Sequence, residues 1–184
     1  GASGSIAAAY FARTAPDGYT VMTHSATHIA NAFLYQKLPY DTLNDFIGVT
    51  TLARQVGALV VHPSLPVTSM KQFIALAKKR PGAINYGSGG HGSFLHVAMA
   101  LLAHTTETNM VHVPYRGGGA AAIALISGET QAEIATLGSV VSFIKSKQIR
   151  AIGVTSEQRV KLFPDIPAIG ETVPGFEFTA WVGC

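Results

Sequence analysis

Residues 84–96 read Ile84-Asn85-Tyr86-Gly87-Ser88-Gly89-Gly90-His91-Gly92-Ser93-Phe94-Leu95-His96. A short β-type run leads into a loop of four glycines and two serines, and the loop leads into a segment with helical spacing of apolar residues. Strand, glycine loop and helix start, in that order, make the βα unit of α/β proteins. The stretch therefore predicts an α/β fold.

The same alternation continues on both sides of this unit. The expected strands are 19–23, 46–52, 58–62, 84–86, 110–113, 131–135, 150–155 and 176–182, and the expected helices are 5–14, 29–35, 70–79, 93–104, 120–127 and 140–145. Residues 164–174 contain three prolines and are expected to form a loop with at most a short helix. Such alternation predicts a parallel sheet with helices on both faces, with ligands at the carboxyl ends of the strands.

Composition excludes several classes of protein. With 48% hydrophobic and 12% charged residues, the 184-residue chain is expected to be a compact globule rather than disordered. The net charge of +3 is spread along the chain. The sequence therefore lacks the basic stripe that is typical of proteins that bind nucleic acid. The single cysteine, Cys184, excludes an intramolecular disulfide, and no apolar run approaches the roughly 20 residues of a membrane span.

The loop at 87–93 has the chemistry of an anion cradle. Glycines allow the backbone to approach a ligand, Ser88 and Ser93 add hydroxyls, and the first N–H groups of the following helix lack intrahelical partners. A phosphate or carboxylate would suit such a loop, whereas an ordinary βα turn with Ser93 as the helix cap is the simpler interpretation. Residues 23–28 and 115–119, the latter with Arg116, are two further loops of this kind.

Enzymatic alternatives receive less support from the residues. Gly87 to Gly92 matches G-x-G-x-x-G, and Arg116 after the next strand would suit NADP, so an NADP-dependent oxidoreductase remains an alternative. No catalytic residues are assigned, because no nucleophile elbow or carboxylate pair stands out. A structural module with an incidental glycine turn is the third interpretation.

Seven histidines raise the question of a metal site. His24 and His28 lie four residues apart and His91 and His96 five apart, but neither pair lies in an H-E-x-x-H motif or has a cysteine partner. We therefore expect no metal ligands and no cofactor.

Seven motifs occur together, in order, along nearly the whole chain. They are APDGYT (15–20), KLPYD (37–41), VVHPSLP (60–66), NYGSGGHGS (85–93), HVPYRG (112–117), IRAIGVTS (149–156) and FPDIP (163–167). In this set the chain resembles the Bug-type extracytoplasmic receptors of tripartite tricarboxylate transporters.

The resemblance implies a periplasmic-binding-protein type II-like fold with two lobes of mostly parallel sheets flanked by helices, and a ligand between the lobes. It implies binding rather than catalysis, with a small organic anion, such as a carboxylate, as ligand and the membrane subunits of a transporter as partners. A periplasmic location follows, with the signal peptide outside this chain.

The binding residues that the resemblance implies lie in two lobes. They are Ser25, Thr27 and His28 in the first lobe, and Ser88, Gly89, Gly90, His91, Gly92, Ser93 and Thr136 in the second. Thr136 stands where many relatives have a polar residue that selects the far end of the ligand. Relatives that prefer amino acids or dicarboxylates often have Asp-Asn near this point, where this chain has Ala135-Thr136.

The resemblance also implies that the chain lacks parts of the family's first lobe. We expect residues 1–58 and 178–184 to be the remainder of lobe one, and residues 59–177 to be a nearly complete lobe two. The apolar segment Trp181-Val182-Gly183-Cys184 at the end suggests that further sequence follows. A fragment with an exposed first-lobe core is expected to self-associate.

Overall fold

The computed structural model describes residues 4–184, and these form two compact units. One contains the described residues up to Gln55 together with Ala180–Cys184, and the other contains Val56–Thr179. Strands β2 (Thr51–Val61) and β7 (Thr179–Gly183) pass from one unit to the other. The chain crosses between the units after residues 55 and 179. The predicted crossings were after residues 58 and 177.

The first unit is small and has little regular structure. It contains α1 (Ser5–Phe11), β1 (His24–Ser25) and α2 (Thr27–Leu34), and β1 pairs antiparallel with β7. The strand predicted at 19–23 is wrong: Tyr19 and Val21 are exposed, and no strand pairing in the described chain includes these residues. β-type residues form a strand only where a neighbour can pair with their backbone groups.

The strands predicted at 46–52 and 58–62 also need correction. Residues 46–50 are not in a strand, and a single strand, β2, runs from Thr51 to Val61 through the gap between the two predicted segments. The residues of β2 become progressively buried along its length, from exposed at Thr51 to fully buried at Val61.

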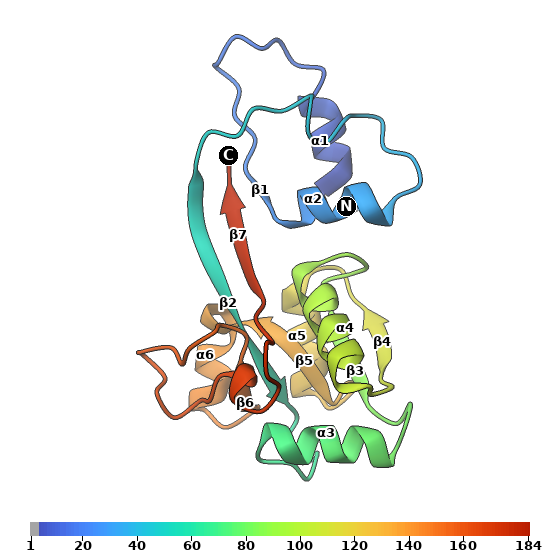
Figure 1. Ribbon diagram of the computed structural model, residues 1–184, viewed down its shortest axis with the longest axis vertical. Coiled ribbons are helices and arrows are strands. Elements are labelled where there is room, and N and C mark those ends of the chain that lie inside the picture. Colours follow the sequence, from blue (N-terminus) through green and yellow to red (C-terminus); the bar gives the residue numbers. More distant parts are fainter. Residues whose placement is uncertain (1–3) are drawn as a thin grey trace. The chain divides into compact units, whose positions relative to one another are not determined.

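The second unit contains the α/β unit predicted from residues 84–96. Its elements, besides the ends of β2 and β7, are α3 (Met70–Lys79), β3 (Asn85–Ser88), α4 (Phe94–Thr106), β4 (Val111–Pro114), α5 (Gly118–Ile126), β5 (Ala132–Thr136), α6 (Leu137–Lys145), β6 (Arg150–Val154) and the short 3-10 helix η2 (Ile169–Glu171). The predicted elements from 70 onward are thus confirmed to within a few residues (Figure 1).

The sheet of this unit is mixed. β3 pairs in parallel with β4 and with β5, whereas β2 pairs antiparallel with both β5 and β6. The strand order is therefore β6-β2-β5-β3-β4. An apolar run reads alike in both directions, so the sequence pattern could not show that β2 runs opposite to its neighbours.

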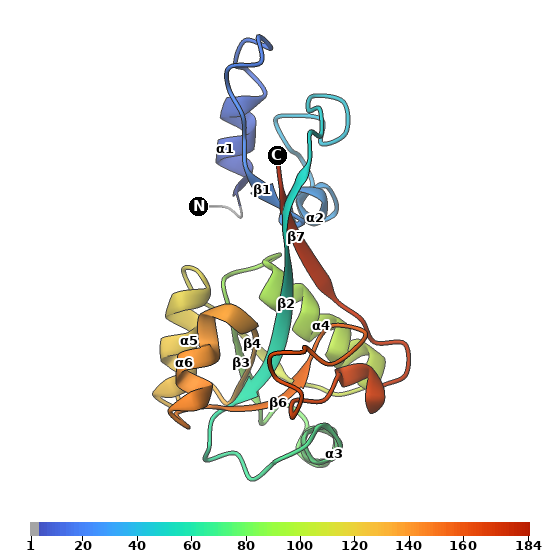
Figure 2. The same ribbon diagram turned by 90° about the vertical axis from the view of Figure 1, so that its left-hand side faces the viewer.

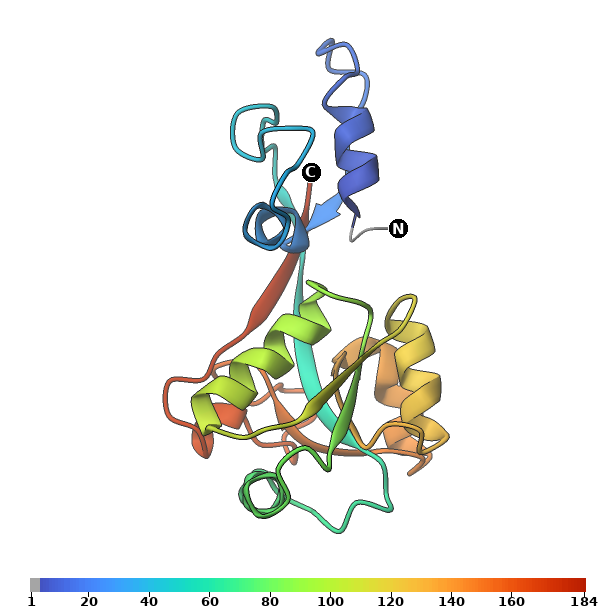
Figure 3. The ribbon, with the colours of Figure 1, turned by 90° about the vertical axis from the view of Figure 1, so that its right-hand side faces the viewer.

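Helices cover both faces of the sheet, as predicted. Leu59 and Val61 of β2 belong to the core beneath α3 and α4, whereas Ala58 and Val60 belong to the core beneath α5 and α6. This division follows from the alternation of side chains along a strand. Figures 2 and 3 show α5 and α6 together on one side of the sheet and α4 on the other. The carboxyl ends of β3, β4 and β5 consequently meet at one edge, where α4, α5 and α6 begin.

Candidate functional site

The β3–α4 loop has the glycine-dependent geometry that the sequence indicated. Gly90 (φ 115°) and Gly92 (φ 72°) have left-handed backbone conformations, which side chains rarely tolerate. A Cβ on Gly89 would lie 3.1 Å from the backbone nitrogen of Gly118. The β3–α4 loop and the β4–α5 loop are thus in backbone contact at the carboxyl edge of the sheet.

Ser93 is the N-cap of α4. Its hydroxyl accepts a hydrogen bond from the backbone N–H of His96 at 3.3 Å, so the simpler interpretation of this serine is confirmed. The described residues provide no hydrogen-bond acceptor for the backbone N–H groups of Phe94 and Leu95. The first turn of α4 therefore keeps two donors, with the positive end of the helix dipole behind them.

Ser88 is fully buried and organises the loop from within. Its Oγ accepts from the N–H of Gly90 at 3.1 Å, lies 3.2 Å from the Gly90 carbonyl, and lies 2.6 Å from Nε2 of His112. The hydroxyl therefore joins the loop to strand β4, because its partners come from both.

Three histidines lie together beside this loop. His91 is in the loop, His96 is in the first turn of α4, and His112 is on β4, opposite Tyr86 of β3. The ring centroids are 5.6 Å apart for His91 and His96, 4.9 Å for His91 and His112, and 4.1 Å for His96 and His112. The sequence placed His91 near His96 but gave no sign of His112, because that residue joins them only through the β3–β4 pairing.

Burial keeps two of these rings neutral. The pKa of His112 falls to about 4, first because of burial and then because of the neighbouring His96 and His91. The pKa of His96 is lowered by burial and by His91. Both imidazoles are therefore uncharged at pH 7, and each has one ring nitrogen that can accept a hydrogen bond. In His96 this nitrogen is Nδ1, which accepts from the N–H of Gly92 at 3.2 Å.

The β4–α5 loop places its charged residue in solvent. Arg116 is exposed, and Gly117 has a left-handed backbone (φ 100°). Tyr115 donates a hydrogen bond from its hydroxyl to Glu129 at 2.8 Å, and burial together with this carboxylate raises the pKa of Tyr115 to about 12. The phenol thus remains protonated, and Arg116 is a cation of this loop.

Thr136 is the last residue of β5 and directly precedes α6. It is half-buried, and its carbonyl accepts a hydrogen bond from the Ser139 hydroxyl at 2.7 Å. Because β3 and β5 are parallel, Thr136 lies at the same edge of the sheet as Ser88. The structure thus brings seven of the ten predicted binding residues to one edge of one unit.

The other three predicted residues belong to the first unit. Ser25 ends β1, and its Oγ accepts from the N–H of Thr27 at 3.4 Å. His28 is buried; its ring stacks on Tyr40 at 5.7 Å and contacts the edge of Phe46 at 4.6 Å. Burial, with His24 nearby, lowers the pKa of His28. His28 therefore packs within this unit as a neutral aromatic ring, and its role in ligand binding stays a prediction.

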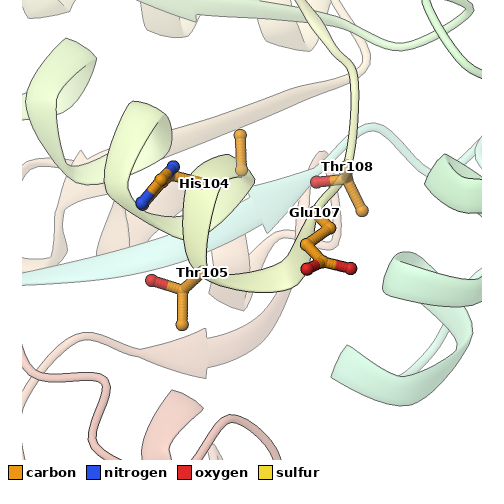
Figure 4. Close-up of a pocket in the computed structure, with 5 residues that line it drawn as sticks. His104, Thr105, Glu107 and Thr108 are labelled. Carbon is orange, nitrogen blue, oxygen red and sulfur yellow. The ribbon is translucent and has the colours of Figure 1, made fainter.

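A shallow depression of about 670 Å³ lies at the opposite end of α4 (Figure 4). It is lined by Ala103, His104, Thr105, Glu107 and Thr108. Its position at the C-terminal end of the helix separates it from the glycine loop, and it contains none of the predicted binding residues.

In residues 4–184 no helix is long and apolar enough to cross a membrane.

Comparison with known proteins places the chain in a family. The family model described as "Tripartite tricarboxylate transporter family receptor" matches residues 1–184. The chain is 34% identical over 185 residues to the "UPF0065 protein in tcbD-tcbE intergenic region" of Pseudomonas sp. (strain P51), covering 100% of this chain and 55% of that protein. It is 31% identical to "Protein BugT" of Bordetella pertussis, covering 98% of this chain and 56% of that protein. The chain thus spans about half the length of these relatives.

Solved structures agree in fold. Rpa4515 of R. palustris, solved with adipate, superposes with a TM-score of 0.93 at 34% identity, covering 100% of this chain and 62% of that one. MatC of Rhodopseudomonas palustris, with bound malate, superposes with a TM-score of 0.90 at 28% identity, covering 100% and 63%. These neighbours confirm the periplasmic-binding-protein fold expected from the resemblance. Because the family model matches residues 1–184, the chain belongs to the tripartite tricarboxylate transporter family of receptors.

Proposed function

We propose that the protein to which this chain belongs is a periplasmic receptor that captures a small carboxylate anion and delivers it to the membrane subunits of a transporter. The ligand carboxylate binds at the β3–α4 loop, from Ser88 to Ser93, in front of the first turn of α4. Thr136, at the same edge of the sheet, contributes to the same site. Ser25, Thr27 and His28 of the first unit are proposed as further ligand-binding residues, and no catalytic residue or cofactor takes part.

The N-terminus of α4 is the observation that carries this proposal. The N–H groups of Phe94 and Leu95 have no acceptor among the described residues, and a carboxylate oxygen is a strong acceptor for such groups. Glycines on both sides of His91 allow the backbone to come close to the anion. Adipate and malate, the molecules bound in the two structural neighbours, are both dicarboxylates.

A pair of substitutions at residue 94 tests the helix terminus. Proline at the first position of a helix removes the N–H without straining the backbone, and Ser93 (φ −64°, ψ 156°) already has the extended conformation that a following proline requires. The ring of Phe94 packs against that of Phe178 at a tilt of 32°, so Phe94→Ala is the matched control that loses this contact but keeps the N–H. A charge-assisted hydrogen bond contributes about 1.5–3 kcal/mol, so Phe94→Pro should bind carboxylate at least about 10-fold more weakly than Phe94→Ala.

The measurement is a thermal-shift and calorimetry panel on the full-length protein. Mono-, di- and tricarboxylates and NADP are the probes, and a ligand at a hundred times its dissociation constant should add about 2.7 kcal/mol of stability. Stabilisation by NADP alone would instead support the oxidoreductase interpretation of Gly87–Gly92. Equal carboxylate affinity of the two Phe94 variants would show that the helix terminus does not hold the anion.

We also propose that the 184-residue chain on its own self-associates through its first unit. Large apolar side chains there are strongly exposed, among them Tyr19 (92%), Ile47 (91%) and Phe33 (87%). Apolar surface of this kind associates in water. Sedimentation velocity should show oligomers that grow with concentration, and a monodisperse monomer would contradict the proposal.

A further inference from the structure

The cluster of His91, His96 and His112 has a second chemical use. One ring nitrogen of each histidine lies within 4.8 Å of the corresponding nitrogen of the other two. We propose that these three side chains bind a divalent transition-metal ion, with Zn²⁺ as the reference probe. The cluster overlaps the β3–α4 loop proposed above to hold the carboxylate, but metal binding is measured without carboxylate, so either proposal can fail while the other stands.

Imidazole nitrogens are the ligands that Zn²⁺, Cu²⁺, Ni²⁺ and Co²⁺ prefer in proteins. Three histidines supply three positions of a tetrahedron and leave the fourth to water or another ligand. His96 and His112 are held on α4 and β4 with their ring centroids 4.1 Å apart, so two of the three ligands are already neighbours.

A small movement of the side chains closes the site. Zn–N bonds of about 2.0–2.1 Å in a tetrahedron separate the nitrogens by about 3.3 Å, so the histidines must approach by at most about 1.5 Å. His91 is the exposed member, and Gly90 and Gly92 flank it with left-handed backbones that make the loop adaptable. His96 and His112 are half-buried on α4 and β4 and form the fixed side of the site.

Ser88 positions the His112 ring. Its buried Oγ lies 2.6 Å from Nε2 of His112 and is itself bonded to the loop backbone at Gly90. Metal-binding histidines commonly donate their second ring N–H to such an acceptor, which fixes the ring and its tautomer. When Nε2–H donates to Ser88, Nδ1 of His112 carries the free lone pair and is the ligand atom.

Metal binding changes one existing hydrogen bond. The N–H of Gly92 donates to Nδ1 of His96 at 3.2 Å. A metal ion on Nδ1 replaces this bond, and a metal ion on Nε2 moves the ring proton to Nδ1, which then no longer accepts. The Gly92 amide is therefore a spectroscopic reporter of the site in either case.

The remaining histidines provide the controls. His104 lies on the same helix as His96 but is exposed at its other end, and it is not a member of the cluster. The ring centroids of His24 and His28 lie 5.1 Å apart in the first unit. Among the described residues no third histidine, cysteine or carboxylate completes a metal-binding group with them. His62 also lies outside the cluster, and its Nδ1 is hydrogen-bonded to the hydroxyl of Ser64 at 2.7 Å.

The experiment is metal titration of the full-length protein without a polyhistidine tag. The protein is treated with a chelator and dialysed into a carboxylate-free buffer, since chelators are themselves polycarboxylates. Calorimetry with Zn²⁺ and visible absorption with Co²⁺ should give one ion per chain and the intense bands of a four-coordinate Co²⁺ centre. The Gly92 amide resonance should shift during the Zn²⁺ titration.

Four variants decide the assignment. His91→Ala, in an exposed loop, and His112→Ala should each bind Zn²⁺ at least about 100-fold more weakly, and Ser88→Ala about 10-fold more weakly. His104→Ala should bind as the wild type does. Circular dichroism of the metal-free variants checks that they are folded. Wild-type affinity in His91→Ala, equal weakening in His104→Ala, or an octahedral Co²⁺ spectrum would each overturn the proposal.

Discussion

Replacing Glu133 by glutamine should remove a pH dependence of stability that a single buried carboxyl creates. Glu133 lies on β5 opposite Val60 of β2, on the face covered by α5 and α6. Its side chain is fully buried, and within residues 4–184 neither carboxyl oxygen has a hydrogen-bond partner. Burial raises the pKa of Glu133 from 4.5 to about 8, so the folded protein keeps this group protonated at pH 7.

The sign and size of the effect follow from proton linkage. The unfolded chain releases the proton near pH 4.5, but the folded chain holds it until about pH 8, so the folded state binds more protons between these values. Stability is therefore fully present below pH 4.5 and falls as the pH rises through this window, by about 1.4 kcal/mol per unit. From pH 4.5 to pH 7 the loss is about 3 kcal/mol.

Urea denaturation followed by far-ultraviolet circular dichroism measures this loss. The free energy of unfolding of Glu133→Gln minus that of the wild type should rise by about 3 kcal/mol between pH 4.5 and pH 7. The lowered pKa values of His28, His96 and His112 act in the opposite direction, raising stability as the pH increases towards 6.5. These contributions are common to both proteins and cancel in the difference.

The exposed Glu157 provides the matched control. Glu157→Gln makes the same chemical change at a side chain that water solvates in both the folded and the unfolded chain, so it separates the effect of burial from that of the substitution itself. A difference between Glu133→Gln and the wild type that stays constant with pH would refute the reasoning, because it would mean that the folded protein does not hold this proton.

Three further perturbations have definite expected results. Gly89→Ala places a Cβ 3.1 Å from the backbone of the β4–α5 loop, so it should lower the free energy of unfolding by about 1–3 kcal/mol in urea denaturation and should weaken carboxylate binding. Gly119→Ala, whose new Cβ would have open space around it, should do neither. Leu102→Ala removes a fully buried side chain of α4 and should lower the free energy of unfolding by about 2–5 kcal/mol. The Ile123 side chain on α5 is 68% exposed, so Ile123→Ala should lower it far less, and similar losses would contradict the assigned packing. Glu171, whose pKa is lowered to about 2 by its hydrogen bonds with Arg159 and the Ala168 N–H, should stay ionised down to acidic pH by carboxyl NMR titration, and Arg159→Ala should return its pKa towards 4.5.

Local signals in the sequence were sufficient for most helices and for the family. Ser93 was predicted as a helix cap, and its hydroxyl accepts a hydrogen bond from the backbone N–H three residues on; Ser69 does the same at the start of α3. Helix α3 begins and ends where its apolar spacing predicted, because caps and periodicity act within a few residues of chain. The seven motifs, met in order, identified the receptor family that the comparison confirmed.

Pairing between distant segments could not be read in the same way. The run at 19–23 has strand-type residues but no strand beside it in the described chain, and β2 joins two segments that looked separate. Whether an extended segment becomes a strand depends on a neighbour that supplies its backbone hydrogen bonds, and that neighbour lies elsewhere in the sequence.

By itself the sequence thus determined the order of βα units, the glycine loop with its helix terminus, and membership of the receptor family. Only the tertiary structure brought His112 of β4 beside His91 and His96, and only it buried Glu133 between the central strands and the helices. Both outcomes depend on strand register, which sets the residues that face one another across a sheet. Register is decided by contacts over dozens of residues of chain, and no local pattern contains them.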